Sequence, residues 1–401
     1  MVQNHIGLVL TGGGARAAYQ TGVLKGIAEI LASRSRITSP FSIIVGTSAG
    51  AINSSLLAAK AENFQDAIDY LCQLWSELQT DQVVRSDFAS LSALGIRWIR
   101  DLSLGGMLGQ SQSTYLLDAQ PLRHFLAERI NFDAIKTNLN ANTLRGFAVT
   151  ATNYHSGTTV TFFDGAPEIQ PWKRKFRLGQ RTELTLKHVL ASAAIPIFFP
   201  PVKLYQSYYG DGCVRMTTPL SPAVHLGADR ILAIGIRHQR PQDMTQEKNQ
   251  QNAMPQISLA DIAGVMLNAA FLDALDADVE RMHRINITVS LLSEKARAQH
   301  PFKLRNIPLL AIRPSQDLGT LASEQFERFP AMLRYLLKGI GASSAKGWDL
   351  LSYLAFDKAY TQRLIELGYG DALAQHDEIK QFCTQENLEQ SDQTDSLSVA
   401  K

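Results

Sequence analysis

The strongest constraint on the fold is a pair of glycine-bearing turns near the start of the chain, each following a short apolar run. The run at 6–10 (IGLVL) leads into GGG at 12–14, and the run at 41–45 (FSIIV) leads into GTSAG at 46–50. Apolar residues at helical spacing follow each turn. Two strands separated by a helix pair in parallel, so this order predicts an α/β fold with helices on both faces of a mostly parallel sheet.

Later segments continue this pattern to about residue 315. We expect a strand pair at 146–152 and 158–163, and buried strands at 231–236 and 309–312. Beyond these strands the pattern is helical, and the chain ends in a polar stretch that cannot bury enough surface to become ordered. The expected organisation is an α/β domain at 1–315, a helical C-terminal region at 316–383 and a disordered tail at 384–401.

Composition narrows the class of protein. The net charge of +2 over 401 residues gives no reason to expect a nucleic-acid partner. Cys72, Cys213 and Cys383 are too far apart for a disulfide framework or a metal knuckle, so we expect no metal or other cofactor. The first apolar run is too short for a signal peptide or a membrane span. We therefore expect a cytoplasmic protein whose membrane contact, if any, is peripheral.

Ser48 is a candidate nucleophile because of the turn that contains it. In a sharp turn from a strand into a helix, flanking glycines avoid clashes and the central side chain stands clear of the sheet, as in a G-x-S-x-G nucleophile elbow. Gly46 and Gly50 have this spacing around Ser48. The following helix also places its positive N-terminal end near the serine oxygen. The alternative is a serine that only caps an ordinary helix.

The glycines at 12–14 are candidates for an oxyanion hole. Consecutive glycines let a backbone approach a ligand closely with several N–H groups free, and a serine nucleophile needs such donors. Gly12, Gly14 and Ala17 also match the dinucleotide fingerprint. That alternative requires an acidic residue at the end of the second strand, where this chain has GTS at 46–48. A P-loop is excluded because no Gly-Lys-Ser/Thr follows the glycines.

The expected base for this serine is Asp211 rather than a histidine. None of the nine histidines lies in a glycine-flanked loop. Asp211 lies in YYGDGC, where flanking glycines let a carboxylate approach a hydroxyl group closely. Burial would raise the pKa of such a carboxyl group and make it a better base. Asp164, in a second Asp-Gly pair, is the competing candidate, but it follows an alternating strand and is typical of a hairpin turn.

Four motifs occur in the order found in patatin-like phospholipases. They are GGGAR at 12–16, GTSAG at 46–50, ASAAIPIFFPPV at 191–202 and YYGDG at 208–212. The chain resembles this family over roughly residues 5–240. The resemblance implies a three-layer α/β/α sandwich with a C-terminal helical extension. It also implies a serine esterase of the phospholipase A type, which hydrolyses acyl esters of lipids with a Ser–Asp dyad and no histidine.

The resemblance also implies a role for each motif residue. Ser48 is similar in position to the nucleophile, and Asp211 to the residue that acts first as base and then as acid. The oxyanion hole would be lined by Gly12, Gly13 and Gly14, and the supporting residues are Arg16, Gly46, Gly50 and Gly212. Arg16 would brace the glycine loop or meet anionic head groups. Thr11, Ala17 and Cys213 depart from the family pattern, which leaves efficiency and substrate choice open.

Three functions stay open at this point: a lipid acyl hydrolase, a catalytically weak or inactive lipid- or membrane-binding module on the same fold, and a dinucleotide-binding protein. The expected partners of the first two are an acyl lipid and a peripheral membrane surface. Residues 81–112 cover an acyl pocket, pack on the core or form a plain loop. The basic-edged stretch at 325–356 either rests on an anionic membrane or packs on the core.

Overall fold

The structure is a computed structural model that describes residues 4–32, 38–85, 115–239, 257–300, 304–329, 331–342 and 347–384. The predicted tail at 384–401 and the stretch at 81–112 lie almost entirely outside these ranges. Within them, ten strands form one sheet. They are β1 (Ile6–Leu10), β2 (Ile43–Thr47), β3 (Gly146–Asn153), β4 (Thr158–Gly165), β5 (Trp172–Arg174), β6 (Arg177–Arg181), β7 (Val202–Leu204), β8 (Ser207–Asp211), β9 (Arg230–Ile234) and β10 (Leu309–Ile312).

Parallel pairing dominates the centre of the sheet. The strand order is β10-β9-β1-β2-β3-β4-β6-β5, and the five strands from β10 to β3 run parallel to one another. Strands β4 and β8 both pair with β3 in the antiparallel direction, and β8 also pairs with β7. The carboxyl ends of β1, β2 and β3 therefore meet at one edge of the sheet, where ligands bind in open α/β folds. The turns at 12–14 and 46–50 lie at this edge.

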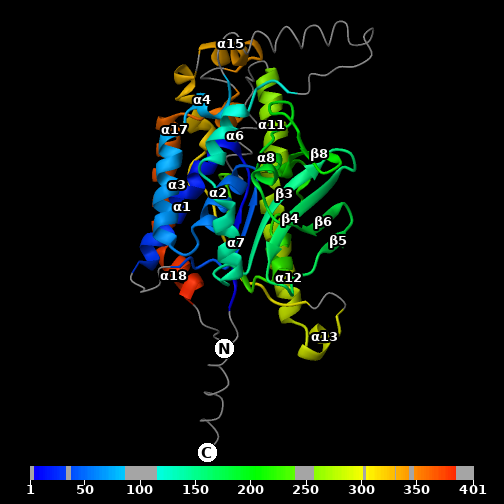
Figure 1. Ribbon diagram of the computed structural model, residues 1–401. Coiled ribbons are helices and arrows are strands. Elements are labelled where there is room, and N and C mark those ends of the chain that lie inside the picture. Colours follow the sequence, from blue (N-terminus) through cyan, green and yellow to red (C-terminus); the bar gives the residue numbers. More distant parts are fainter. Residues whose placement is uncertain are drawn as a thin grey trace, which may run out of the picture.

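Alternate residues of the central strands face two separate cores. Leu8 and Leu10 of β1 belong to the larger core, whereas Val9 between them belongs to the smaller one on the opposite face. Helices cover both faces (Figure 1). The larger core is covered by α1 (Ala18–Leu31), α2 (Ala49–Ala59), α3 (Phe64–Glu77), α6 (Gln120–Ala127), α7 (Phe132–Asn140), α8 (Leu186–Ser192) and α17 (Lys358–Ala374), and the smaller core by α9 (Ser221–Leu226) and α12 (Asp273–Ser290). The predicted α/β/α sandwich with a mostly parallel central sheet is confirmed.

The C-terminal helices pack against the helix that follows the glycine loop. Helix α17 lies along α1 (Figure 1), and their backbones approach closely where Gly22 of α1 meets the Ile365 carbonyl of α17. Gly368 of α17 meets the Tyr19 carbonyl in the same way.

The remaining helices are η1 (Gly14–Ala17), α4 (Thr80–Val83), η2 (Gly212–Arg215), α11 (Leu259–Phe271), α13 (Glu294–Gln299), α14 (Leu318–Ser323), η3 (Phe326–Arg328), α15 (Ala331–Gly339), α16 (Trp348–Leu354) and α18 (His376–Thr384).

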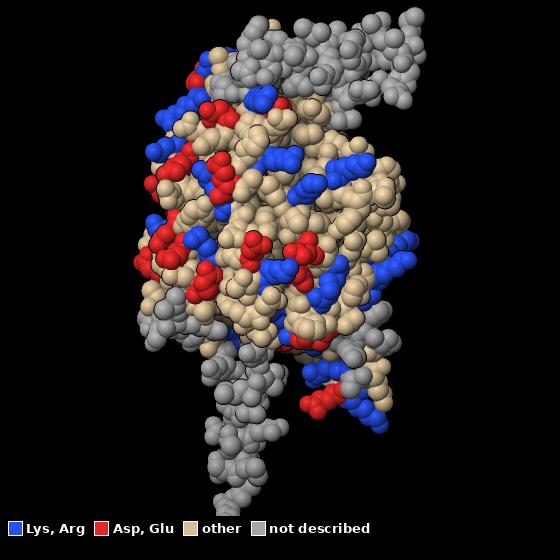
Figure 2. Space-filling view, viewed as in Figure 1, with Lys and Arg blue, Asp and Glu red and all other residues tan. Residues whose placement is uncertain are grey.

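The surface carries both signs of charge. Figure 2 shows acidic and basic side chains scattered over one face with wide uncharged areas between them. This distribution agrees with the small net charge of +2. Among the helices that the structure describes, none combines the length and the apolar character needed to cross a bilayer.

Candidate active site

Ser48 occupies a sharp turn between β2 and α2. Its φ of 57° and ψ of −129° are unusual for a residue that carries a side chain, so the turn is strained. Although Ser48 precedes α2, its side chain makes no capping hydrogen bond, which argues against a simple N-cap. Its backbone N–H donates to Ser192 Oγ (2.9 Å), and Ser192 Oγ donates to the Thr150 carbonyl (2.6 Å). The turn is thus tied to strand β3.

Strand β3 also brings Asp211 to the serine. Thr47 at the end of β2 pairs with Thr150, and Asp211 at the end of β8 pairs with the next residue of β3, Ala151. This register explains how two residues that are 163 positions apart in the sequence come together. Ser48 Oγ donates a hydrogen bond of 2.5 Å to Asp211 Oδ2. The predicted nucleophile and the predicted base are therefore in direct contact.

The carboxyl group of Asp211 is completely buried, and its surroundings control its protonation. Burial raises its pKa from the ordinary 3.8 to about 7, because a charge is costly in a medium that excludes water. Hydrogen bonds from the Ser48 hydroxyl and from the Cys213 backbone N–H (2.9 Å, to Oδ1) act in the opposite direction, since they stabilise the carboxylate. A group with a pKa near 7 can take and return a proton at neutral pH.

Gly12 brings the glycine loop into contact with the nucleophile. A Cβ atom at this position would collide with Ser48 Cβ and with Cys213 Sγ, so only glycine fits. The Gly12 backbone also hydrogen-bonds to the Cys213 thiol, whose pKa is raised well above its usual value by burial. The cysteine therefore lies between the loop and the dyad as a buried residue.

The other glycines of the predicted site allow equally close packing. Gly14 has a φ of +58° and lies against the Tyr353 carbonyl of α16. A Cβ atom would also collide with a neighbour at each remaining position. The neighbours are Ile236 for Gly13, Ser54 for Gly46, the Leu10 carbonyl for Gly50 and the Thr150 carbonyl for Gly212.

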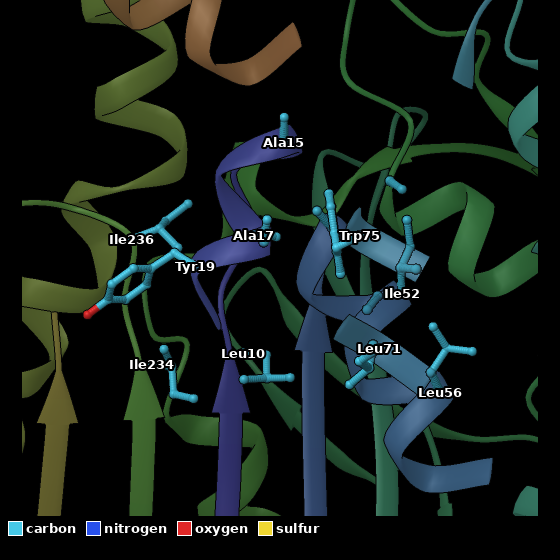
Figure 3. Packing of buried hydrophobic residues seen from close by; sticks show 14 of the residues in the cluster. Leu10, Ala15, Ala17, Tyr19, Ile52, Leu56, Leu71, Trp75, Ile234 and Ile236 are labelled. Atoms are coloured by element: carbon cyan, nitrogen blue, oxygen red, sulfur yellow. The ribbon is translucent and has the colours of Figure 1, made fainter. Parts of the chain in front are cut away.

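An apolar cavity opens beside Ser48. Its empty space, with solvent at the mouth included, is about 460 Å³. Ile52 of α2 and Trp75 of α3, both labelled in Figure 3, belong to its wall. The other lining residues are Gly14, Ala49, Leu74, Leu78, Val83, Leu122, Phe125, Leu126, Ala193, Ile195, Phe199 and Phe356. Since almost all of these side chains are apolar, the cavity suits a hydrocarbon chain.

Arg16 is buried and makes internal contacts. Only 3% of its side chain is exposed, and the guanidinium lies 4.6 Å from the centre of the Tyr353 ring. Its Nε donates to Ser352 Oγ (2.6 Å), and its NH2 group pairs with the Asp349 carboxylate (2.9 Å). All three partners belong to α16, so Arg16 ties the glycine loop to the C-terminal helices.

The competing candidate Asp164 lies elsewhere. It pairs with Phe147 near the start of β3, three residues before Thr150, and its carboxylate forms an ion pair of 3.3 Å with Arg181. The predicted hairpin turn at Asp164 is wrong, because this residue belongs to strand β4.

Two hydroxyl residues that support the dyad were missed by sequence reasoning. Ser192 holds the Ser48 backbone, as described above, and Thr152 Oγ1 donates to the Asp211 carbonyl (2.8 Å). Ser192 lies inside the ASAAIPIFFPPV motif, where a lone hydroxyl in an apolar run was an available signal. Thr152 belongs to an ordinary-looking strand and gives no such signal.

Comparisons with known proteins identify a family and three similar solved structures. A family model described as patatin-like phospholipase matches residues 8–224. A comparison with curated proteins gave no match. Three solved structures are similar to the chain. VipD from Legionella pneumophila shares 12% identity (TM-score 0.36; 94% of this chain and 67% of that chain covered). Human GIVD cytosolic phospholipase A2 shares 14% (TM-score 0.44; 95% and 59%), and ExoU from Pseudomonas aeruginosa, solved with SpcU, shares 14% (TM-score 0.26; 92% and 77%). The chain thus spans less than two thirds of the human structure.

The match to the family model begins in β1, before the glycine loop, and ends in α9, after Asp211, so it includes all four motifs. It covers more than half of the chain. The protein therefore belongs to the patatin-like phospholipase family.

Proposed function

We propose that this protein is a lipid acyl hydrolase that cleaves carboxylic esters of phospholipids or related acyl lipids. The observation that carries the proposal is the 2.5 Å hydrogen bond between Ser48 Oγ and the buried Asp211 carboxylate, at the wall of an apolar cavity. Family membership supports the same class of reaction. The head group and the length of the acyl chain are not part of the proposal.

The proposed reaction has two halves. In the first, Asp211 takes the Ser48 proton while Ser48 Oγ attacks the ester carbonyl carbon, and the protonated Asp211 then gives this proton to the departing alcohol. In the second, water attacks the acyl-enzyme, Asp211 takes a proton from the water and returns it to Ser48, and the fatty acid leaves. The negative oxygen formed in each half would be stabilised by backbone N–H groups of the loop at 12–14.

The apolar lining of the cavity supports the proposal that the cavity binds the acyl chain of the substrate. Its wall contains apolar side chains such as Ile52, Leu78 and Phe125. Binding a hydrocarbon chain against them is favourable because it removes apolar surface from water. Ser48 lies at this wall, so a chain in the cavity would have its ester group near the nucleophile. A charged or strongly polar substrate group finds no partner among these side chains.

Substitution of the dyad tests the proposal. Ser48→Ala and Asp211→Asn should each lower kcat for p-nitrophenyl butyrate by about 10⁴-fold or more, since neither half of the reaction proceeds without them. Asp164→Asn is the matched control for the second variant, because it changes the other Asp-Gly pair and should keep wild-type kcat. Circular dichroism and thermal unfolding would check that all three variants fold.

Covalent labelling separates hydrolysis from mere binding. A fluorophosphonate probe should label the wild type at Ser48, as located by mass spectrometry of the labelled peptide, and should not label Ser48→Ala. If the wild type binds acyl lipids but neither labels nor hydrolyses esters, it is a binding module on this fold. Thermal stabilisation by NAD would instead favour a dinucleotide-binding protein.

A further inference from the structure

A chain of polar side chains crosses the apolar layer between α1, α2 and α3. Trp75 Nε1 donates to Asn53 Oδ1 (2.7 Å), Asn53 Nδ2 donates to Gln20 Oε1 (3.0 Å), and Gln20 Nε2 donates to the Thr11 carbonyl (2.8 Å). Gln20 and Asn53 are completely buried, and Trp75 is 1% exposed. Burying amide groups among apolar side chains is costly unless they are hydrogen-bonded, so a fully connected chain calls for an explanation.

Trp75 sets the order of donors and acceptors along this series of hydrogen bonds. An indole N–H can only donate, so Asn53 must turn its oxygen toward Trp75. The nitrogen of Asn53 then faces Gln20, which must present its own oxygen. The nitrogen of Gln20 is therefore left for the Thr11 carbonyl. One aromatic side chain in the cavity wall thus fixes the orientation of two amides and of the peptide group beyond them.

Gln20 and Asn53 each hold one end of the glycine loop. Gln20 binds the carbonyl of Thr11, directly before the three glycines, and Asn53 Nδ2 also donates to the carbonyl of Ala17, directly after Arg16 (3.1 Å). A peptide group is planar, so holding the Thr11 carbonyl also sets the direction of the Gly12 N–H. Gly12 is the loop residue that contacts the nucleophile.

We propose that Gln20, Asn53 and Trp75 form a positioning relay that aligns the glycine loop with Ser48. The proposal rests on the proposed function, because alignment of the loop matters for stabilising a negative oxygen on the substrate. A relay of this kind acts on the transition state and leaves binding of a short substrate almost unchanged. It differs from a purely structural network, which would affect stability alone.

Kinetics of two relay variants test this assignment. Gln20→Met and Trp75→Phe keep most of the side-chain volume. The first removes the amide that accepts from Asn53 and donates to the Thr11 carbonyl, and the second removes the indole N–H that donates to Asn53. Each should lower kcat for p-nitrophenyl butyrate by about 10- to 100-fold with KM within about threefold, a smaller loss than removal of an oxyanion donor causes. Because both changes cut the same relay, the double variant should lie within about threefold of Gln20→Met alone. Multiplied losses, losses confined to KM, or wild-type kcat in both single variants would overturn the proposal.

Two control variants change residues on the helices that carry Gln20 and Asn53. Thr21→Val, on the same helix as Gln20, changes a buried hydroxyl that has no hydrogen-bond partner among the described residues, and should keep wild-type kcat. Ser55→Ala, on the same helix as Asn53, removes a buried hydroxyl that donates to the Ala51 carbonyl within α2, and should also keep wild-type kcat. If Gln20→Met fails to fold, Trp75→Phe carries the kinetic test by itself.

Hydrogen exchange provides a readout that does not depend on hydrolysis. Backbone amides of residues 11–17 should exchange at least about threefold faster in Gln20→Met and in Trp75→Phe than in the wild type and in Thr21→Val. Unchanged exchange in both relay variants would overturn the relay. If the wild type hydrolyses no ester at all, the proposed function fails, while this comparison still decides whether the relay holds the loop.

Discussion

At the scale of single residues, the proposed chemistry depends on the pKa of one carboxyl group, which burial raises and hydrogen bonds lower. Asp211 has no exposed surface, and this raises its pKa. Ser48 and the Cys213 N–H donate to it and limit the rise to about 7. A serine–histidine pair reaches the same working range with an imidazole whose ordinary pKa is near neutrality. Here the fold gives an aspartate a pKa in the same range, as the proposed base requires.

The pH dependence of the reaction should report this balance. In the proposed reaction Asp211 accepts the Ser48 proton only in its carboxylate form, so kcat/KM should fall as the pH drops through about 7 and level off above about pH 8. The measurement is kcat/KM for p-nitrophenyl butyrate between pH 5 and 9, corrected for spontaneous hydrolysis. A fall centred near pH 4, the ordinary range of an aspartate, would show that burial does not control the base.

At the scale of elements, the sequence predicts what depends on local apolar pattern and turn chemistry. The run at 309–312 is apolar and becomes β10 with the predicted bounds, and GTSAG at 46–50 gives the turn at Ser48. Strands β5, β6, β7 and β8 were missed because they are short, and because β5 (WKR) and β6 (RLGQR) are also mostly polar. They owe their structure to neighbouring strands, and a pattern within one segment cannot reveal such neighbours.

The contact between α1 and α17 makes a prediction at this scale. Gly22→Ala would push a methyl group into the Ile365 carbonyl of α17, so we expect the free energy of unfolding to fall by about 1–3 kcal/mol. Gly370→Ala in α17 is the control, since a Cβ atom there meets open space and alanine favours a helix by up to about 1 kcal/mol. Urea unfolding of both variants makes the comparison. Equal stability of the two would mean that these helices pack less closely than the structure indicates.

At the scale of the whole molecule, the candidate site extends beyond the part of the chain that carries the family motifs. The family match ends at residue 224, but Arg16 in the glycine loop binds Asp349 and Ser352 of α16. These two partners lie 333 and 336 positions after Arg16 in the sequence. The sequence predicted that Arg16 would brace the loop or meet a head group, and it gave no means of choosing. Likewise, Gln20 and Asn53 look like ordinary helix residues until the fold brings them together.

The two roles of Arg16 predict different substrate profiles. If Arg16 braces the loop, Arg16→Met should lower kcat about 10-fold or more for a neutral p-nitrophenyl ester and for an anionic phospholipid alike, and should destabilise the fold by about 2–4 kcal/mol because Asp349 and Ser352 lose their partner. Arg363→Met, which removes an exposed arginine of α17, should change stability by less than about 0.5 kcal/mol. If Arg16 instead bound head groups, the loss would be confined to the anionic lipid and would appear mainly in KM. Because the guanidinium is buried and bound on α16, we expect the loss on both substrates.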